Sequence, residues 1–221
     1  MIEPTDKIGR ITLYNADCME VMKTFKDKQF DLAIVDPPYG IGVNKMTLGN
    51  GKRKIFRGNT DWDMKSPKKE YFNELIRVSK NQIIWGANHF ISKIPFDSSC
   101  WIFWDKGTGD NDFADGELAW TSFGTTVRKY FKSWVGANAK ERTEESRIHP
   151  TQKPVALYKW LLKNYAKEGD KILDTHFGSL SIGIACEKLG FELTAIELDK
   201  DYYRMAKQRL LNFKKQLTIE F

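Results

Sequence analysis

Short apolar runs alternate with amphipathic segments along most of the chain, a pattern typical of an α/β sheet. Seven runs rich in aliphatic and aromatic residues predict strands: Ile11–Asn15, Phe30–Asp36, Asn81–Gly86, Cys100–Asp105, Glu117–Phe123, Lys171–Asp174 and Glu192–Glu197. Five further segments predict helices: Asp17–Thr24, Pro67–Ser79, Pro154–Ala166, Ser181–Leu189 and Lys200–Lys214. Because parallel strands need crossover connections, this alternation predicts a mostly parallel sheet with helices on both faces.

Two long segments, Gly40–Ser66 and Gly124–Gln152, show no such periodicity. Loops of this length inside a compact domain are usually functional or disordered. A chain of 221 residues can bury roughly 70% of its unfolded surface around one core. We therefore expect a single domain, residues 1–221, with these two segments as inserted loops.

The chain holds 35 basic and 29 acidic residues, for a net charge of +6. Residues 41–69 contain eight basic residues against two acidic ones, which equals the excess of the whole chain, and residues 128–147 form a second basic stretch. Basic residues beside glycine and aromatic residues favour contact with a nucleic-acid backbone, although a solvated surface loop explains the charge equally well. The candidate contact residues are Lys45, Lys52, Arg53, Lys54, Arg57, Arg128, Lys132 and Arg142.

The three cysteines, Cys18, Cys100 and Cys186, lie far apart and form no CxxC pair. This spacing argues against a disulfide framework and against a zinc site, and the chain has only three histidines. No apolar run approaches the length of a membrane span, and the N-terminal residues do not resemble a signal peptide. We expect a protein of a reducing cytoplasm that binds no metal.

The strongest chemical signal is the strand Phe30–Asp36, which runs directly into Pro37-Pro38-Tyr39-Gly40. Two prolines keep the chain extended and leave their carbonyls free. Ligands of open parallel sheets bind beyond the carboxyl ends of the strands, where this turn is expected. The Asp36 carboxylate and the Pro37 carbonyl can each accept a hydrogen of an exocyclic amino group, while Tyr39 stacks on the ring that carries it. A rigid turn without function is the alternative.

The stretch Asp36-Pro37-Pro38-Tyr39 resembles the catalytic motif of the amino-methylating DNA methyltransferases. These enzymes transfer a methyl group from S-adenosylmethionine to the exocyclic nitrogen of adenine or cytosine. The resemblance implies a Rossmann-like methyltransferase sheet in a single domain with inserted DNA-recognition loops. It also implies catalytic roles for Asp36, Pro37, Pro38 and Tyr39. A motif headed by Asp, rather than Ser, favours adenine as the target.

Three later stretches, His149–Pro154, Lys171–Ser179 and Leu193–Asp199, are similar to the cofactor-binding part of the same family. A glycine loop lets the backbone approach a ligand, and a carboxylate at the end of the next strand can accept bonds from ribose hydroxyls. Glu197 follows Asp174 by 23 residues, close to the spacing expected for that role. The implied cofactor-binding residues are Asp17, Asp36, Thr151, Lys153, Asp174, Phe177, Gly178, Ser179, Glu197 and Leu198.

The order of these motifs, catalytic before cofactor-binding, resembles that of the subgroup usually called β. Asp17 can equally be a helix N-cap. One departure concerns the cofactor loop, which in the family reads Asp-Pro-Phe-x-Gly-Ser-Gly-Thr-Thr. Here Leu180 replaces a glycine, and His176 also departs from the pattern. Because a tight loop can require the left-handed backbone that glycine adopts freely, either this turn is built differently or cofactor affinity is reduced.

On this resemblance we expect in-line attack by the amino nitrogen of a flipped-out base on the sulfonium methyl, without a covalent enzyme intermediate. Double-stranded DNA is the implied partner, contacted by residues 40–69 and 124–148, and residues 149–215 form the implied cofactor-binding part. The implied location is the cytoplasm of a prokaryote or of a phage-infected cell. A homodimer and a restriction-endonuclease partner stay open.

Three other functions also stay open. The first is a cytosine-N4 DNA methyltransferase. The second is an enzyme that methylates RNA or a protein glutamine, although protein enzymes usually head the related motif with Asn. The third is a DNA-binding protein whose cofactor site has decayed at Leu180.

The segment Trp85–Phe90 resembles a family segment near the target-base pocket, but ordinary packing of Trp85 and Phe90, with Asn88 as a cap, explains it as well. Alternating aromatic residues on strands are usually buried. We therefore predict core positions for Trp101, Phe103, Trp104 and Trp120.

Overall fold

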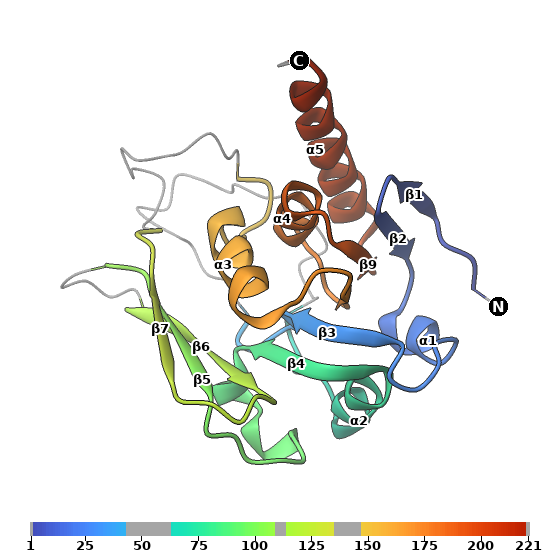
Figure 1. Ribbon diagram of the computed structural model, residues 1–221. Helices are drawn as coiled ribbons and strands as arrows, with labels where there is room; N and C mark the ends of the chain where they lie inside the picture. Colours follow the sequence, from blue (N-terminus) through green and yellow to red (C-terminus); the bar gives the residue numbers. More distant parts are fainter. Residues whose placement is uncertain (1, 43–62, 109–113, 135–146, 220–221) are drawn as a thin grey trace.

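Five parallel strands form the centre of the sheet in the computed structural model, which describes residues 2–42, 63–108, 114–134 and 147–219 (Figure 1). Across the described residues, the strand order is β1-β2-β9-β8-β3-β4-β6-β5-β7. In chain order the strands are β1 (Asp6–Ile8), β2 (Ile11–Asn15), β3 (Phe30–Val35), β4 (Ser79–Trp85), β5 (Trp101–Asp105), β6 (Gly116–Thr121), β7 (Arg128–Phe131), β8 (Lys171–Asp174) and β9 (Glu192–Glu197).

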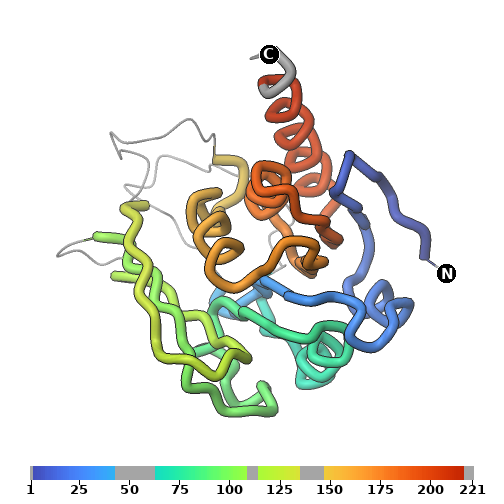
Figure 2. Tube along the Cα trace, in the orientation of Figure 1, coloured from blue at the N-terminus to red at the C-terminus, as the bar shows by residue number. Residues whose placement is uncertain are grey.

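The parallel pairing runs without interruption from β2 through β9, β8 and β3 to β4. It places an N-terminal strand beside a C-terminal one, because Leu13 of β2 pairs with Ala195 of β9 (Figure 2). The carboxyl ends of these strands share one edge of the sheet. Asp36, Asp174 and Glu197 therefore lie at that common edge.

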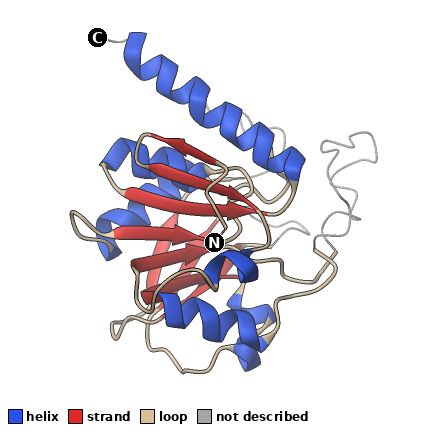
Figure 3. Ribbon diagram, turned by 90° about the vertical axis from the view of Figure 1, so that its right-hand side faces the viewer, coloured by secondary structure: helices blue, strands red, loops and turns tan. Residues whose placement is uncertain are grey.

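Helices cover both faces of the sheet, as the alternating pattern predicts (Figure 3). The helices are α1 (Cys18–Met22), α2 (Lys69–Val78), α3 (Val155–Tyr165), α4 (Ser181–Leu189) and α5 (Lys200–Ile219), with short 3₁₀ turns at Ala87–His89 and Ile91–Lys93. Side chains of α1 and α2 belong to one buried cluster, and those of α3, α4 and α5 belong to the other. Among the residues described, no helix is both long and apolar enough to cross a membrane.

Strand β3 shows why the central strands consist of continuous apolar residues. Leu32 and Ile34 face the α3–α5 cluster, whereas Ala33 and Val35 face the α1–α2 cluster. All four side chains are at most 1% exposed. Burying a branched aliphatic side chain stabilises a fold by about 1.5–3 kcal/mol, so a polar residue in the middle of this strand has no favourable orientation.

The predicted elements are largely confirmed. β2, β8, β9 and α4 have the predicted bounds, and β3 ends at Val35, so that Asp36 begins the turn. Of the aromatic residues predicted for the core, Trp104 and Trp120 are 1% exposed, while Trp101 and Phe103 are only half-buried. Trp85 and Phe90 are buried as well, but Asn88 caps no helix end, since Gly86 holds that position.

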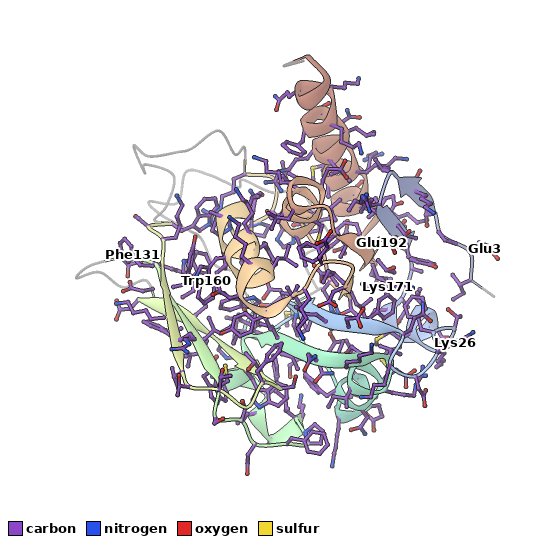
Figure 4. The ribbon with its side chains drawn as sticks, viewed as in Figure 1. Glu3, Lys26, Phe131, Trp160, Lys171 and Glu192 are labelled. Atoms are coloured by element: carbon purple, nitrogen blue, oxygen red, sulfur yellow. The ribbon has the colours of Figure 1, made fainter. Side chains whose placement is uncertain are left out.

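The absence of regular structure that we expected throughout Gly124–Gln152 is wrong for Arg128–Phe131, which forms the edge strand β7. The hydrophobic pattern missed it because β7 pairs only with β5 and has an open edge. Tyr130 packs inward, 5.2 Å from the ring of Trp160 in α3, whereas Phe131 is 62% exposed (Figure 4). The short strand β1 was also not predicted, because it too lies at an edge of the sheet.

The turn before α4 is formed without the family's glycine. Leu180 adopts the left-handed backbone, with φ of 56°, and its side chain is 1% exposed. A non-glycine residue in this conformation costs about 1–2 kcal/mol, which burial of the leucine side chain can offset. Gly183 makes room for that side chain, because a Cβ there would lie 2.7 Å from Leu180 Cγ. The turn is therefore built differently from the family pattern.

We expect Gly183→Ala to lower the free energy of unfolding by about 1–3 kcal/mol, although alanine is normally the better helix former. The added methyl collides with the buried Leu180 side chain, so the turn or the helix has to shift. Urea denaturation followed by circular dichroism measures the loss.

Leu180→Ala provides the matched background for this test. With the obstructing side chain removed, Gly183→Ala should be neutral or stabilising. Equal destabilisation in the two backgrounds would contradict the contact between these residues.

Candidate active site

A cavity of about 1100 Å³ opens at the carboxyl edge of the parallel strands and contains most of the residues predicted for the site. Its lining includes Asp17, Asp36, Pro38, Thr151, Lys153, Phe177, Gly178, Ser179, Glu197 and Leu198. Asp174 is 1% exposed and does not line it, and Pro37 is buried in the turn. Tyr39 instead borders a second hollow of about 550 Å³, together with His89 and Lys93. Segments far apart in the sequence thus meet in one place.

The turn after β3 is held by Asp63, which the sequence analysis did not identify. Pro37 and Pro38 have no N–H, and the next two amides, of Tyr39 and Gly40, both donate to Asp63 Oδ1 at 2.8 and 3.0 Å. Asp63 is 2% exposed. A buried carboxylate that accepts two backbone hydrogen bonds fixes the direction of the turn. The sequence around the turn does not reveal this contact, because Asp63 lies far from the turn along the chain.

Tyr39 packs against the turn that follows β4. Its ring is stacked on His89, with centroids 5.0 Å apart and planes 18° apart. Gly86, with φ of +69°, lies so close that a Cβ would approach Tyr39 Cε1 to 2.0 Å. Only glycine fits this position, both for its backbone conformation and for the ring beside it. The segment Trp85–Phe90 therefore borders the Asp36–Gly40 turn while also contributing to the core.

A buried ammonium group lies at the centre of the site. Lys153 is 1% exposed in its side chain, and its Nζ is 2.5 Å from Asp36 Oδ2 and 2.9 Å from Glu117 Oε2. Glu117 also pairs with Lys106 at 2.5 Å. The Tyr39 hydroxyl donates to Asp36 Oδ1 at 2.8 Å. Two carboxylates and two ammonium groups thus compensate one another inside the protein.

These contacts set the charge of each group. Burial raises the pKa of Asp36 above its ordinary value, and Lys153 only partly opposes that rise. Burial also acts to raise the pKa of Glu117, but Lys153 and Lys106 outweigh it and hold that pKa well below its ordinary range. On acidification, the proton is therefore taken up at Asp36 before Glu117.

The cofactor loop is organised around Glu197. Its Oε2 accepts from the Gly178 amide and its Oε1 from the Asp199 amide, both at 2.9 Å. Burial raises the pKa of Glu197 to about 7 and that of Asp174 to about 8. Ionisation of these two carboxyl groups is therefore costly, and a cationic ligand or a pair of hydroxyl donors at Glu197 would reduce that cost.

A chain of polar side chains explains the histidine in this loop. Tyr71 Oη is 2.6 Å from Thr175 Oγ1, which is 2.9 Å from His176 Nδ1. His176 Nε2 then lies 3.8 Å from Cys18 Sγ. Burial lowers the pKa of His176 to about 4, so its ring is neutral at pH 7. The ring packs edge-on to Tyr71, which gives it the packing role of an aromatic residue.

Asp17 combines both roles considered for it. Its Oδ1 accepts from the Met19 amide at 2.7 Å as the N-cap of α1, and the residue lines the cavity. Phe177 and Tyr202 supply buried aromatic walls, and Leu198 is 67% exposed beside them. Together, these acidic, aromatic and apolar side chains suit a ligand that carries a planar ring, hydroxyl groups and positive charge.

Only two of the residues predicted to contact nucleic acid lie within the described part of the chain. Arg128 is exposed on β7, and Lys132 is half-buried just after it. The other predicted contacts fall outside the described residues: Lys45, Lys52, Arg53, Lys54, Arg57 and Arg142.

Known proteins share this sequence pattern. The sequence model of the N6/N4 DNA methylase family matches residues 104–208. The type II methyltransferase M2.DpnII of Streptococcus pneumoniae is 24% identical over 95% of this chain and 93% of its own. M.HpaI of Haemophilus parainfluenzae is 27% identical over 88% of this chain and 72% of its own. In sequence, this chain is therefore similar to the amino-methylating DNA methylases.

Solved structures share the fold of this chain. The complex of M1.HpyAVI with S-adenosylmethionine superposes with a TM-score of 0.60 at 23% identity, covering 90% of this chain and 98% of that one. The cytosine-N4-specific PvuII methyltransferase gives 0.62 at 12% identity, covering 97% and 94%. The Rossmann-like architecture predicted from the sequence is thereby confirmed.

We expect the pH dependence of the free energy of unfolding to change in Glu197→Gln. Because the pKa of Glu197 is raised from 4.5 to about 7 on folding, the folded state binds that proton more tightly than the unfolded chain. The carboxyl therefore destabilises the fold increasingly as pH rises from about 4.5 to about 7. Relative to wild type, Glu197→Gln should gain about 2 kcal/mol between pH 5 and pH 8 in urea denaturation.

Glu192→Gln is the matched control, because Glu192 begins the same strand with its side chain in solvent (Figure 4). It should show no comparable gain. A Glu197→Gln difference that stays level across this pH range would contradict the burial of that carboxyl.

Proposed function

We propose that this protein is a DNA methyltransferase that uses S-adenosylmethionine to methylate the exocyclic amino group of adenine in double-stranded DNA. One observation carries the proposal. Asp36 and Pro38 of the turn after β3 line the same cavity as Gly178 and Glu197, although these two pairs come from opposite halves of the chain. A methyl acceptor held at the turn would then meet a cofactor held at the loop.

The residues present fit this cofactor. S-adenosylmethionine, when bound, supplies an electrophilic methyl group on a positively charged sulfur. Glu197 is placed to accept from ribose hydroxyls, Phe177 and Leu198 offer apolar surface to a planar ring, and Asp17 adds negative charge at the rim. The formed turn at Leu180 argues against a decayed site.

Asp36 receives the amino group in this proposal. Its carboxylate accepts one hydrogen of the amine and the Pro37 carbonyl accepts the other, which directs the nitrogen lone pair away from the ring. Asp36 can then hold the proton that the methylated nitrogen loses, since burial raises the pKa of this carboxyl. Lys153 and Asp63 hold the acceptor groups in place, so little reorganisation is needed at the reaction.

The target base must leave the duplex to reach this buried carboxylate, at a cost of a few kcal/mol. Arg128 and Lys132, with the basic residues of 40–69 and 124–148, are proposed to contact the phosphates that offset this cost. The names of the curated relatives support DNA as the substrate and a restriction-modification setting.

Adenine is proposed because Asp36 heads the motif, as is usual in the family's adenine enzymes. Cytosine N4 is the alternative target, and it is supported by the fold that the chain shares with the cytosine-N4-specific PvuII enzyme. Both bases present an exocyclic amino group to the same acceptors, so identification of the methylated base distinguishes the two activities.

We expect the purified chain to transfer labelled methyl groups from S-adenosylmethionine to unmethylated DNA, and nucleoside mass spectrometry should detect N6-methyladenine. Asp36→Ala should reduce the transfer rate by at least about 100-fold, because the amine loses its charged acceptor.

The control is Asp31→Ala, which removes the aspartate at the opposite end of the same strand, where it pairs with Lys80. That variant should retain activity. Detection of N4-methylcytosine would reassign the base, and full activity of Asp36→Ala would overturn the role given to this carboxylate.

A further inference from the structure

Glu117 occupies a position in the site that the catalytic motif and the cofactor loop do not account for. It lies on β6, and its carboxylate faces Asp36 across the Lys153 ammonium. One oxygen, Oε1, pairs with Lys106, and the other, Oε2, is 2.9 Å from Lys153 and 3.2 Å from the Tyr39 hydroxyl. The carboxylate therefore touches three groups that surround the reacting turn.

Asp36 is already engaged on both oxygens. Lys153 holds Oδ2 at 2.5 Å, and the Tyr39 hydroxyl donates to Oδ1 at 2.8 Å. A phenol has one proton to donate, and two acceptors lie within its reach, Asp36 Oδ1 and Glu117 Oε2. When the Tyr39 proton turns to Glu117, Asp36 Oδ1 loses a donor and becomes free to accept from another group.

We propose that Glu117 is a positioning residue for methyl transfer, which holds Lys153 against Asp36 and takes over the Tyr39 hydrogen bond when the amino group of the target base arrives. This inference rests on the function proposed above. Glu117 does not touch the substrate, and it acts through Lys153 and Tyr39.

Charge balance gives Glu117 a second effect on Asp36. Two ammonium groups, of Lys106 and Lys153, face two carboxylates in a nearly closed interior. The negative charge of Glu117 adds to the effect of burial in raising the pKa of Asp36. Removing that charge without changing the shape should therefore make Asp36 easier to ionise.

Other titratable groups also interact with Asp36, and the test leaves them unchanged. These groups come from several elements around the turn: Lys153, Tyr39, Tyr71, Tyr158 and Asp174.

The decisive variant is Glu117→Gln, which keeps an acceptor oxygen but loses the charge. We expect kcat to fall at least about tenfold, with the KM for DNA and the Kd for S-adenosylmethionine changed by less than about threefold. The acid limb of the kcat profile should move to lower pH. Independently of activity, carbon-13 NMR of aspartate-labelled protein should show a lower pKa for the Asp36 carboxyl, whose signal is assigned by its absence in Asp36→Asn.

Glu187→Gln is the matched control. Glu187 pairs with Lys214 at 2.5 Å and is 17% exposed in its side chain, against 20% for Glu117, but it lies on α4 outside the cavity lining. The control should leave kcat and the Asp36 titration unchanged. A Glu117→Gln enzyme with wild-type kcat, or with an unmoved acid limb and Asp36 pKa, would overturn the inference.

Glu117→Asp covers the case in which the glutamine variant does not fold. It keeps the charge but withdraws the carboxylate by one methylene, so kcat should fall while the acid limb stays in place. A wild-type kcat for this variant would contradict the role in positioning. If the wild-type chain transfers no methyl group to DNA, the proposed function fails, whereas an active wild type with active Glu117 variants refutes only the role of Glu117.

Discussion

The ammonium group of Lys153 ties together the parts of the chain that form the site. A buried charge costs several kcal/mol unless oppositely charged groups surround it, and here Asp36 and Glu117 do so. Asp36 follows a parallel strand, Glu117 lies on an antiparallel one, and Lys153 precedes α3. The segment before α3 can therefore dock only where both strands present their carboxylates, which links the catalytic turn to the antiparallel half of the sheet.

The two sides of the cavity differ in how their carboxylates are compensated. At the catalytic turn, lysines and a tyrosine hydroxyl neutralise Asp36 and Glu117. At the cofactor loop, the amides of Gly178 and Asp199 donate to Glu197, and burial raises its pKa to about 7. Charged side chains of the protein thus compensate the carboxylates at one side of the cavity. At the other side, a ligand would provide that compensation, as is typical of binding sites in which function reduces stability.

The cofactor loop departs from the family motif at two positions, and residues outside the motif accommodate both changes. Leu180 takes the left-handed backbone conformation that glycine adopts freely, and Gly183, about one turn later, provides the space for its side chain. His176 likewise packs edge-on to Tyr71 and joins a polar chain. A departure at one position of a motif is therefore best interpreted together with the residues that contact it in three dimensions.

The central strands, the catalytic turn and the cofactor loop could be predicted because their signals are local. A strand buried on both faces must be apolar along its length, and a motif needs only consecutive residues to be recognised. Glu117, Lys106, Asp63 and the packing of Tyr39 could not be predicted, since they depend on β6 lying beside β4 and on Lys153 reaching Asp36 from the other end of the chain. The edge strand β7 was missed for a related reason, because three of its four residues are exposed to solvent. The sequence by itself determined which chemistry the chain carries, and the tertiary structure decided which charges surround it, because a buried ion pair is specified by neighbours in space and not by neighbours in sequence.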